Sequence, residues 1–340
     1  MVAQPTDHPV IPAPRIGVLL VNLGTPDAPT PQAVRRYLRE FLSDPRVVEL
    51  PRALWWPILN GPILLFRPAK TAKLYDAIWD HERGESPLRT ITRAQAGNLS
   101  DALGNHHDII VDWAMRYGEP SIADRLAAQK ERGFQRILIF SLYPQISAAT
   151  TASVHDRVFD VLKTMRWQPT LRTVPPFHDH PAYIDALAAT VQRDLAGLDW
   201  KPEKLLLSFH GMPARTLELG DPYHCQCQKT ARLLRQRLGW DEANVVVSFQ
   251  SRFGPAKWLE PYTDETVRAL ARQGTKRIMV MAPGFVSDCL ETLEELALGV
   301  RKSFLASGGE EFHYLSCLNA GAPAIDLFAT IARQELAGWI

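Results

Sequence analysis

The chain has 340 residues, of which 46% are hydrophobic and 22% charged, and its formal net charge is +1. This composition excludes a disordered chain and gives no electrostatic reason to expect a nucleic-acid partner, while the length suffices for two domains. No apolar run reaches the roughly 18 residues that a membrane-spanning helix needs. The polar, proline-rich start predicts a disordered tail over residues 1–14 and no signal peptide.

Short apolar runs rich in β-branched residues alternate with helical patterns along the chain. Such alternation predicts an α/β fold, in which helices cover parallel sheets. The expected strands are Ile16–Leu23, Ile109–Met115, Arg136–Leu142, Leu171–Val174, Lys204–Phe209, Asn244–Phe249, Arg277–Met281 and Phe312–Cys317. The expected helices include Ile122–Arg132, Tyr183–Ala196, Cys227–Leu238, Thr263–Gln273, a last crossover helix over Val300–Ser307 and a final helix over Pro323–Leu336.

Four strands followed by four more predict two similar doubly wound lobes, each with a four-stranded parallel sheet flanked by helices. The boundary is expected near Pro175–Phe177. We therefore expect one lobe to comprise residues 15–176 and 323–340, with the final helix packing back on it. The other lobe would comprise residues 177–322.

The segment Leu50–Phe66 is rich in aliphatic and aromatic side chains, and Pro57 and Pro62 forbid one long helix there. It is either a buried connection under the core or an exposed apolar lip that binds a flat, greasy ligand or touches a membrane. Cations on both sides suit an amphiphilic anion and favour the lip. The candidate lip residues are Trp55, Trp56, Ile58, Leu59, Leu64 and Leu65, and the flanking cations are Arg52, Arg67, Lys70 and Lys73.

Polar and glycine-containing segments follow many of the expected strands. These segments are Asn22–Pro26, Arg116–Gly118, Tyr143–Gln145, His210–Gly211, Gln250–Arg252 and Pro283–Phe285. Open α/β sheets bind ligands beyond the carboxyl ends of their strands. One cleft between the two lobes could therefore collect all of these segments.

His210 ends an expected strand and precedes Gly211–Pro213, where a helix cannot begin at once. Such a histidine is either structural or part of a site. Asp288, Glu291 and Glu295 follow an i, i+3, i+7 pattern that puts three carboxylates on one helical face. The acids either complement a helix N-terminus or, together with the lone histidine, move protons and handle a divalent cation.

Four cysteines, Cys225, Cys227, Cys289 and Cys317, could hold zinc or an iron–sulfur cluster. Their spacing matches no standard ligand set, so unligated thiols in a reducing cytoplasm are expected. No GxGxxG follows the first strand and no GxxxxGK[ST] occurs, so nucleotide cofactors are not expected.

Several short motifs follow one another in a specific order along the chain. They are Gly17–Pro26 (GVLLVNLGTP), Gly84–Leu88 (GESPL), Met115–Gly118 (MRYG), Tyr143–Ser147 (YPQIS), Ser208–Pro213 (SFHGMP), Gly220–Tyr223 (GDPY), Ser248–Pro261 (SFQSRFGPAKWLEP) and Ser287–Glu295. In this order and spacing they resemble the ferrochelatase family, whose members insert ferrous iron into a porphyrin. The resemblance runs from about Ile16 to Leu336.

The resemblance implies two Rossmann-like, chelatase-like lobes with a porphyrin cleft between them and the hydrophobic lip at Leu50–Phe66. It implies that His210 is the essential histidine and Glu291 the catalytic acid, both touching the metal. Asp288 and Glu295 would form a proton path on a widened, π-type helix turn. The implied porphyrin-binding residues are Leu23, Arg67, Ser86, Arg116, Tyr117, Tyr143, Ser147 and Trp258.

Three departures from the family pattern bear on the ligand set, the cluster and the substrate. Cys289 stands where many relatives have histidine, so a second imidazole near the acids is missing. The cysteine-rich C-terminal extension of animal enzymes is absent, so no iron–sulfur cluster is expected. Leu23 stands where coproporphyrin-using relatives tend to have tyrosine, which favours protoporphyrin IX.

The expected function is therefore a lyase that inserts Fe²⁺ into protoporphyrin IX to form protohaem, without an organic cofactor. The alternatives are a chelatase for coproporphyrin or for cobalt or nickel, and a porphyrin or haem carrier without catalysis. The expected partners are protoporphyrin IX, Fe²⁺ and a membrane surface, and no nucleic acid. We expect a monomer or weak homodimer in the cytoplasm, with peripheral contact to the inner face of the membrane.

Overall fold

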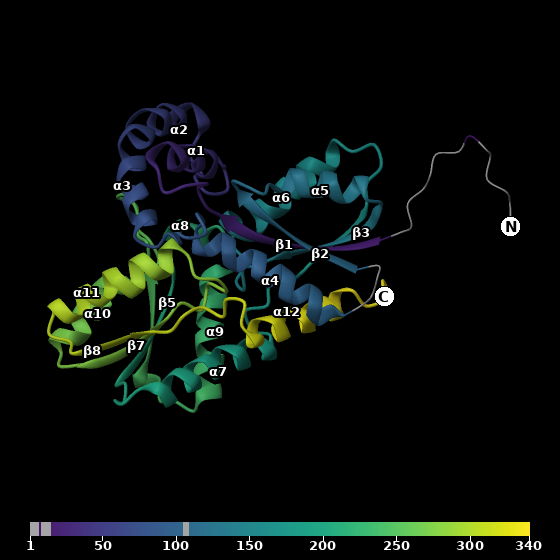
Figure 1. The fold of residues 1–340 in the computed structure, drawn as a ribbon. Coiled ribbons are helices and arrows are strands. Elements are labelled where there is room, and N and C mark those ends of the chain that lie inside the picture. The colour runs from purple at the N-terminus through teal and green to yellow at the C-terminus, as the bar shows by residue number, and fades with distance from the viewer. Residues whose placement is uncertain (1–6, 8–14, 105–108) are drawn as a thin grey trace.

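The structure is a computed structural model that describes residues 7, 15–104 and 109–340. The expected tail over residues 1–14 lies outside the described residues, Asp7 apart. Two separate four-stranded parallel sheets, each with helices on both faces, confirm the predicted α/β fold of two lobes (Figure 1). Within the described part of the chain, no helix is long and apolar enough to cross a membrane.

The sheet of the first lobe has the order β2-β1-β3-β4. Its strands are β1 (Arg15–Gly24), β2 (Ile109–Tyr117), β3 (Phe134–Ser141) and β4 (Thr170–Thr173). Val18, Leu19, Leu20 and Val21 are all fully buried, because β1 has neighbours on both edges and helices on both faces. The unbroken apolar run in the sequence reflects this burial on both faces.

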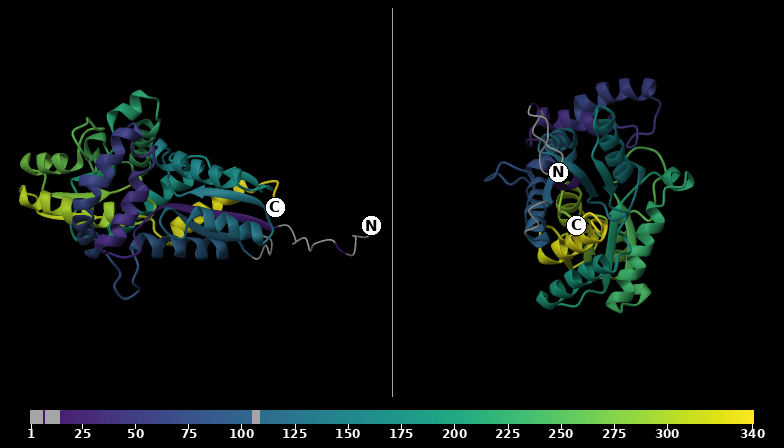
Figure 2. Two further views of the ribbon diagram at one scale, coloured as in Figure 1. Left: turned by 90° about the horizontal axis from the view of Figure 1, so that it is seen from above. Right: turned by 90° about the vertical axis from the view of Figure 1, so that its right-hand side faces the viewer.

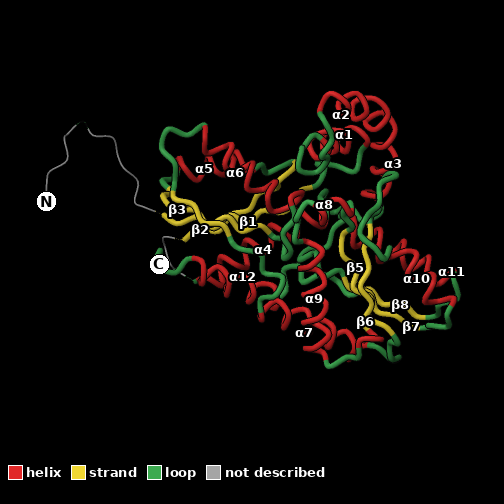
Figure 3. Tube along the Cα trace, turned by 180° about the vertical axis from the view of Figure 1, so that it is seen from behind, coloured by secondary structure: helices red, strands yellow, loops and turns green. Residues whose placement is uncertain are grey.

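The sheet of the second lobe repeats the arrangement with the order β6-β5-β7-β8. Its strands are β5 (Lys204–His210), β6 (Val245–Gln250), β7 (Arg277–Met281) and β8 (Glu311–Tyr314). The interior of β5 is again buried, with Leu205, Leu206 and Leu207 fully inaccessible to solvent. Figure 3 shows the two sheets, in yellow, as separate bodies.

The α-helices of the described chain are α1 (Pro31–Leu42), α2 (Arg52–Ile58), α3 (Leu64–Asp76), α4 (Pro87–Leu103), α5 (Ile122–Glu131), α6 (Ser153–Lys163), α7 (Pro181–Gly197), α8 (Ala214–Glu218), α9 (Tyr223–Leu238), α10 (Thr263–Arg272), α11 (Arg301–Ala306) and α12 (Ala322–Glu335). The six predicted helices correspond to α5, α7, α9, α10, α11 and α12, and the described chain has further α-helices for which no segment was predicted. Wider or tighter helical segments are η1 (Leu59–Ile63), η2 (Ala148–Ala152), η3 (Glu242–Asn244) and η4 (Glu291–Val300). Of these, η1, η2 and η4 are π-type.

One buried apolar cluster extends across both lobes. The final helix α12 contributes to it, since the Phe328 ring lies edge-on to Phe140 of β3 with the ring centroids 5.4 Å apart. Figure 1 shows α12 alongside α4, and the Arg333 guanidinium at its end donates to the Ala102 carbonyl of that helix. The Gln145 amide crosses between the lobes, donating to the Thr230 hydroxyl at 3.1 Å. The two lobes are therefore tied together by apolar and polar contacts.

For Leu50–Phe66 the sequence predicts either an exposed lip or a buried connection. In the structure, part of this segment is exposed and part is buried. The chain is helical up to Ile58 and again from Leu64, and Gly61 breaks the helical path with φ −85° and ψ −111°. Trp56 and Leu65 are 50% and 60% exposed, as a lip requires, and Ile58 is exposed as well. Figure 2 shows this region, in blue, at the top of its right-hand view.

Leu59 and Leu64 correct the prediction of the lip. They are 0% and 1% exposed and pack in one apolar cluster with Val34 and Leu38 of α1. Trp55 is half-buried against the same cluster, and its indole N–H donates to the Leu42 carbonyl at 2.7 Å. A helical hairpin has an inner and an outer face, so only part of an apolar run can face outward.

Candidate active site between the lobes

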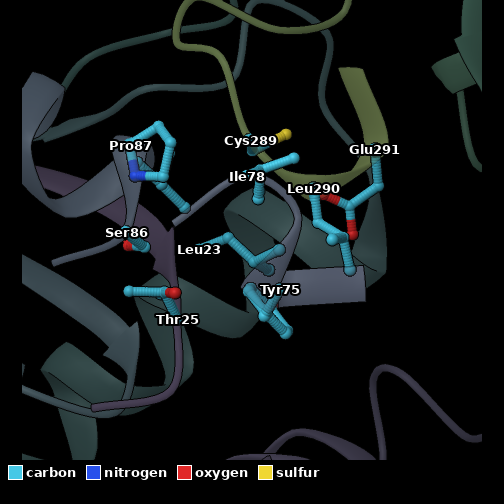
Figure 4. A pocket seen from close by; sticks show the side chains of 11 residues that line it. Leu23, Thr25, Tyr75, Ile78, Ser86, Pro87, Cys289, Leu290 and Glu291 are labelled. Carbon is cyan, nitrogen blue, oxygen red and sulfur yellow. The ribbon is translucent and has the colours of Figure 1, made fainter. Parts of the chain in front are cut away.

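A small cavity is lined by both lobes. The first lobe contributes Leu23–Thr25 at the carboxyl end of β1, Tyr75 and Ile78 at and beyond the end of α3, and the start of α4 from Ser86. The second lobe contributes Cys289–Glu291, which leads into η4. Figure 4 shows Glu291 and Leu23 among the side chains around this space. The cavity lies beyond the carboxyl end of β1, as expected for an open α/β sheet. Of the six strand-end segments predicted to share one cleft, only Asn22–Pro26 contributes to its lining.

His210 is the last residue of β5, and contacts of its backbone and of its ring hold it in place. Its carbonyl accepts a hydrogen bond from the Tyr223 hydroxyl at 2.9 Å, and its ring lies edge-on to Phe285. The next residue must be glycine, because a Cβ on Gly211 would come within 2.5 Å of the Gln250 carbonyl oxygen. Burial lowers the pKa of His210, and the nearby Glu291 carboxylate acts in the opposite direction.

Glu291 opens the π-type helix η4, which confirms the widened helix that the family resemblance implied. Its carbonyl accepts a hydrogen bond from Gln250 Nε2 at 2.7 Å, which anchors the first turn of η4 to the end of β6. Its carboxylate is directed at the cavity (Figure 4). A π-type turn is often found at functional sites, because it re-aims side chains that a regular helix would space differently.

Glu295 lies further along η4, and its carboxylate is held by Ser251. The Ser251 amide donates to Oε1 at 2.7 Å, and the Ser251 hydroxyl donates to Oε2. Burial raises the pKa of Glu295, the Ser251 hydrogen bonds lower it, and the Glu291 charge raises it again. A partly buried carboxylate next to a second one is a group that can exchange protons.

Asp288 departs from the predicted helical face. It precedes the helix, so the expectation that three carboxylates share one helical face is wrong for this residue. Its Oδ1 accepts from the Tyr314 hydroxyl at 2.8 Å and from the Thr292 hydroxyl at 3.0 Å, and its Oδ2 accepts from Asn319 Nδ2 at 2.7 Å. The buried carboxylate thus joins the start of η4 to the segment after β8.

Arg116 and Tyr117, two of the expected porphyrin-binding residues, are occupied by partners in the protein. The Arg116 guanidinium pairs with the Asp44 carboxylate and donates to Ser153, and the Tyr117 hydroxyl donates to the same carboxylate at 2.8 Å. Burial tends to raise the pKa of Asp44, but hydrogen bonds from Ser153, Arg46 and Tyr117 and the Arg116 charge hold it below its ordinary value. This network holds the Arg116 and Tyr117 side chains in place at the carboxyl end of β2, next to the end of β1.

Asp44→Asn is expected to lower the free energy of unfolding by about 3 kcal/mol at pH 7, because Arg116 would lose its buried counter-ion. The folded pKa of Asp44 lies below the unfolded value, so this stability is present above about pH 4 and is lost as the pH falls below it. Urea unfolding at pH 7 and pH 3 should therefore show a difference that shrinks in acid. The exposed pair of Asp27 and Arg36 is the control, and Asp27→Asn should cost about 0.5 kcal/mol or less.

Tyr143, Ser147 and Trp258 lie on segments that join the lobes. The Tyr143 hydroxyl is buried without a hydrogen-bond partner among the described residues, and burial raises its pKa. The Ser147 hydroxyl bonds Asp221 of the second lobe at 3.2 Å. Trp258 is half-buried and forms a β-bridge with Pro213, which brings its ring over Gly211. Trp258 is thus brought next to His210 although the two residues are distant in sequence.

Arg67, Ser86 and Leu23 lie on the first-lobe side. Arg67 is half-buried over the ring of Phe253, and no carboxylate of the described chain lies within ion-pair distance of it. Burial lowers its pKa. Ser86 is buried at the N-cap of α4, where its hydroxyl accepts from the Arg89 amide at 3.3 Å. Leu23 and Ser86 both line the cavity.

Tyr75 also belongs to the cavity, although it is not among the residues predicted from the sequence. Its side chain lines the cavity near Glu291, and burial, followed by the Glu291 charge, raises its pKa. The sequence pattern that could have revealed Tyr75 is its helical spacing. The buried face of α3 consists of Leu64, Pro68, Ala72 and Tyr75. A tyrosine that continues an apolar row brings a hydroxyl to the end of that row, where the cavity begins.

The four cysteines carry free thiols and do not come together. Cys225 is exposed, and Cys227, two residues later in α9, lies buried against Tyr223. Cys289 and Cys317 lie near Asp288, and burial raises the pKa of both thiols. Among the described residues, no group of three or more His, Cys, Asp or Glu side chains is preformed for a metal ion.

Comparison with known proteins identifies close relatives. A family model described as ferrochelatase matches residues 15–336. The ferrochelatase of Rhizobium meliloti (strain 1021) is 56% identical over 98% of this chain and 99% of its own length. The ferrochelatase of Agrobacterium fabrum (strain C58) is 55% identical over 99% of this chain and 98% of its own length.

Solved structures with a similar fold are far more distant in sequence. SirB from Bacillus subtilis with Fe³⁺ has a TM-score of 0.58 at 11% identity, covering 96% of this chain and 97% of that one. DR2241 from Deinococcus radiodurans, described as similar to chelatases, has a TM-score of 0.54 at 12% identity, covering 94% of this chain and 55% of that one. These likenesses show the chelatase-like fold alone. The family match and the full-length relatives go further, and the chain belongs to the ferrochelatase family.

Proposed function

We propose that this protein inserts Fe²⁺ into protoporphyrin IX, forming protohaem and releasing two protons. Membership of the ferrochelatase family supports the reaction. The observation that carries the assignment of residues is that Glu291, at the start of η4, lines a cavity shared by both lobes, and that its charge acts on the His210 imidazole at the end of β5.

The chemistry explains why an imidazole and a carboxylate suit this reaction. A free porphyrin has two pyrrole N–H groups, so insertion of one divalent cation must release two protons. The nitrogen lone pairs lie in the ring plane, and bending the ring to expose them takes about 1–5 kcal/mol, which binding of the ring edges can supply. Imidazole and carboxylate bind ferrous iron without enclosing it, so the ion can pass on to the ring. We assign these two contacts to His210 and Glu291.

We propose that pyrrole protons leave along η4 through Glu295. The carboxylate of Glu295 lies near Glu291, and within the described chain it accepts hydrogen bonds only from Ser251 and Gln250. Asp288 extends the acidic row, but hydrogen bonds already occupy both of its oxygens. In this proposal Asp288 holds the segment that leads into η4 and takes a proton only when one of those donors withdraws.

We assign the remaining predicted residues to the macrocycle. Leu23 and Trp258 would contact its faces, and Tyr143 and Ser147 its edge. Arg67, a half-buried cation without a carboxylate partner in the described chain, and Ser86 would receive its propionates. Arg116 and Tyr117 would support the pocket without hydrogen-bonding the porphyrin, because their polar atoms already bond Asp44 and Ser153.

The experiment that tests the function is anaerobic incubation with protoporphyrin IX and Fe²⁺. Porphyrin fluorescence should disappear and a haem spectrum should appear, at a rate proportional to enzyme. Faster turnover of coproporphyrin, or with cobalt or nickel only, would assign the protein to another tetrapyrrole chelatase. Tight porphyrin binding without metal insertion would indicate a carrier and overturn the proposal.

We also propose that the protein acts as a monomer or weakly associated dimer at the inner face of the membrane, without an organic cofactor or an iron–sulfur cluster. Leu54 and Phe66 add to the exposed apolar surface around Trp56 and Leu65. Such a surface, flanked by cations, suits contact with an anionic bilayer and entry of an apolar substrate.

Trp56→Ser is expected to lower binding to anionic vesicles about tenfold, since a tryptophan that enters the bilayer interface contributes roughly 1.5 kcal/mol. Its melting temperature should change little, because the side chain is half exposed. Trp55→Ser is the matched comparison and should instead destabilise the fold, because its indole packs on α1 and bonds the Leu42 carbonyl. Vesicle sedimentation and thermal unfolding measure both. Equal vesicle binding by native and Trp56→Ser protein would exclude the membrane contact.

A further inference from the structure

Ser251 has an unusual backbone conformation directly after β6. Its φ is +64°, and the only other non-glycine residue with positive φ in the described chain is Asn319. Residues with a Cβ rarely adopt this left-handed conformation, and serine has no special tolerance for it. A strained residue next to a site is a reason to ask what the strain achieves.

The left-handed turn directs two donors of one residue at one carboxylate. The Ser251 amide donates to Glu295 Oε1 at 2.7 Å, and the hydroxyl of the same residue donates to Oε2. Each oxygen of Glu295 therefore has its own donor, and the plane of the carboxylate is fixed. Donors of this kind stabilise the ionised form most, which offsets the effect of burial on the pKa of Glu295.

Gln250, the residue before it, acts on the backbone of the same helix. The Ser208 hydroxyl donates to Gln250 Oε1 at 2.7 Å, which fixes the orientation of the amide. Gln250 Nε2 then donates to the Glu291 carbonyl at 2.7 Å and reaches Glu295 Oε2 at 3.5 Å. The end of β6 thus holds η4 at Glu291 and at Glu295.

We propose that Ser251 is a positioning residue that fixes the Glu295 carboxylate beside Glu291, and that Gln250 fixes the helical turn that carries Glu291. This inference rests on the proposed function, in which Glu295 accepts protons released from the porphyrin. The inference also explains why residue 251 is a serine and not a glycine. A glycine would adopt φ +64° without strain, but it would leave Oε2 without the hydroxyl donor.

A plainer role for Ser251 would be to anchor the exposed segment that follows it. That segment carries Phe253, against which Arg67 packs, and leads to Trp258. Loss of an anchor would disturb porphyrin binding, whereas loss of carboxylate positioning would disturb turnover. The two roles therefore differ in which kinetic constant changes.

The test compares three substitutions at one position. Ser251→Gly removes the hydroxyl and keeps the amide donor without strain, whereas Ser251→Ala removes the hydroxyl and keeps the strain. Ser251→Asn tolerates the left-handed conformation and keeps a side-chain donor. We expect Ser251→Gly and Ser251→Ala to lower kcat about tenfold with the KM for porphyrin unchanged, and Ser251→Asn to recover most of the loss.

A double-mutant cycle shows whether Ser251 acts through Glu295. In a Glu295→Gln background, Ser251→Gly should lower kcat no further, because the carboxylate that it positions is gone. Ser303→Ala removes another hydroxyl contact in the same lobe, to Arg268, and serves as the control with unchanged kcat. Zinc in place of iron gives a fluorescent product and a second reading of the same rates.

Three results would overturn the inference. They are an unchanged kcat in Ser251→Gly, a raised KM for porphyrin with kcat intact, and an equal loss of kcat in the native and Glu295→Gln backgrounds. A native protein that inserts no metal would instead overturn the proposed function, and with it the inference. The native protein measured beside the variants separates these two failures.

Discussion

His210→Ala should abolish metal insertion, with a loss of about 10³-fold or more in kcat. The imidazole is the group that we place opposite Glu291, and alanine can neither bind a metal nor accept a proton. The fold should survive, because the hydrogen bond to this residue from Tyr223 is received by the backbone carbonyl. Porphyrin binding, followed by fluorescence quenching, should remain close to native. The rate of haem formation under anaerobic conditions measures the effect.

His224→Ala is the matched control. That imidazole stacks on the ring of Phe249, and our mechanism does not use it. Its removal should leave metal insertion close to native. A His210→Ala variant that keeps more than about a tenth of the native rate would contradict the assignment, because losing an essential proton acceptor or ligand costs far more.

Glu291→Gln should lower kcat by about 10²-fold or more. The substitution keeps the shape of the side chain and the hydrogen bond from Gln250, which the Glu291 backbone receives. It removes only the negative charge and the proton-accepting oxygen. We therefore expect native-like thermal unfolding and porphyrin affinity, with the loss confined to turnover and to the dependence of rate on metal concentration.

Glu294→Gln provides the comparison on the same helix. Glu294 is partly buried, and burial raises its pKa, but it does not line the cavity. Its neutralisation should leave kcat within about twofold of native, as for a surface charge outside the site. Equal losses in the two variants would mean that the overall charge of η4, rather than the Glu291 carboxylate, supports the reaction.

The acidic row shows where prediction from sequence fails. The i, i+3, i+7 pattern of Asp288, Glu291 and Glu295 assumes a regular helix, and η4 is a wide helix that begins only at Glu291. Asp288, which precedes the helix, is held by Asn319, whose side chain bonds both its amide and its carboxylate. These residues are 31 positions apart, so no local pattern could reveal the contact.

The lip shows a second limit. The apolar run predicted an exposed surface, and Trp56 and Leu65 form one. Leu59 and Leu64 have the same chemistry but face α1. Which face of an interrupted helix is buried depends on how it docks on its neighbour, and two prolines and a glycine make that docking impossible to infer from periodicity.

The sequence by itself determined the two sheets, because strands buried on both faces must be continuous apolar runs, and it placed His210 at a strand end. Its motifs also determined the ferrochelatase family. Only the tertiary structure decided which groups act on one another. It brought Ser251 to Glu295 across 44 residues, moved Asp288 out of the helix, and paired Arg116 with Asp44. Local patterns encode burial and helix or strand period, whereas contacts between distant residues exist only once the lobes have packed together.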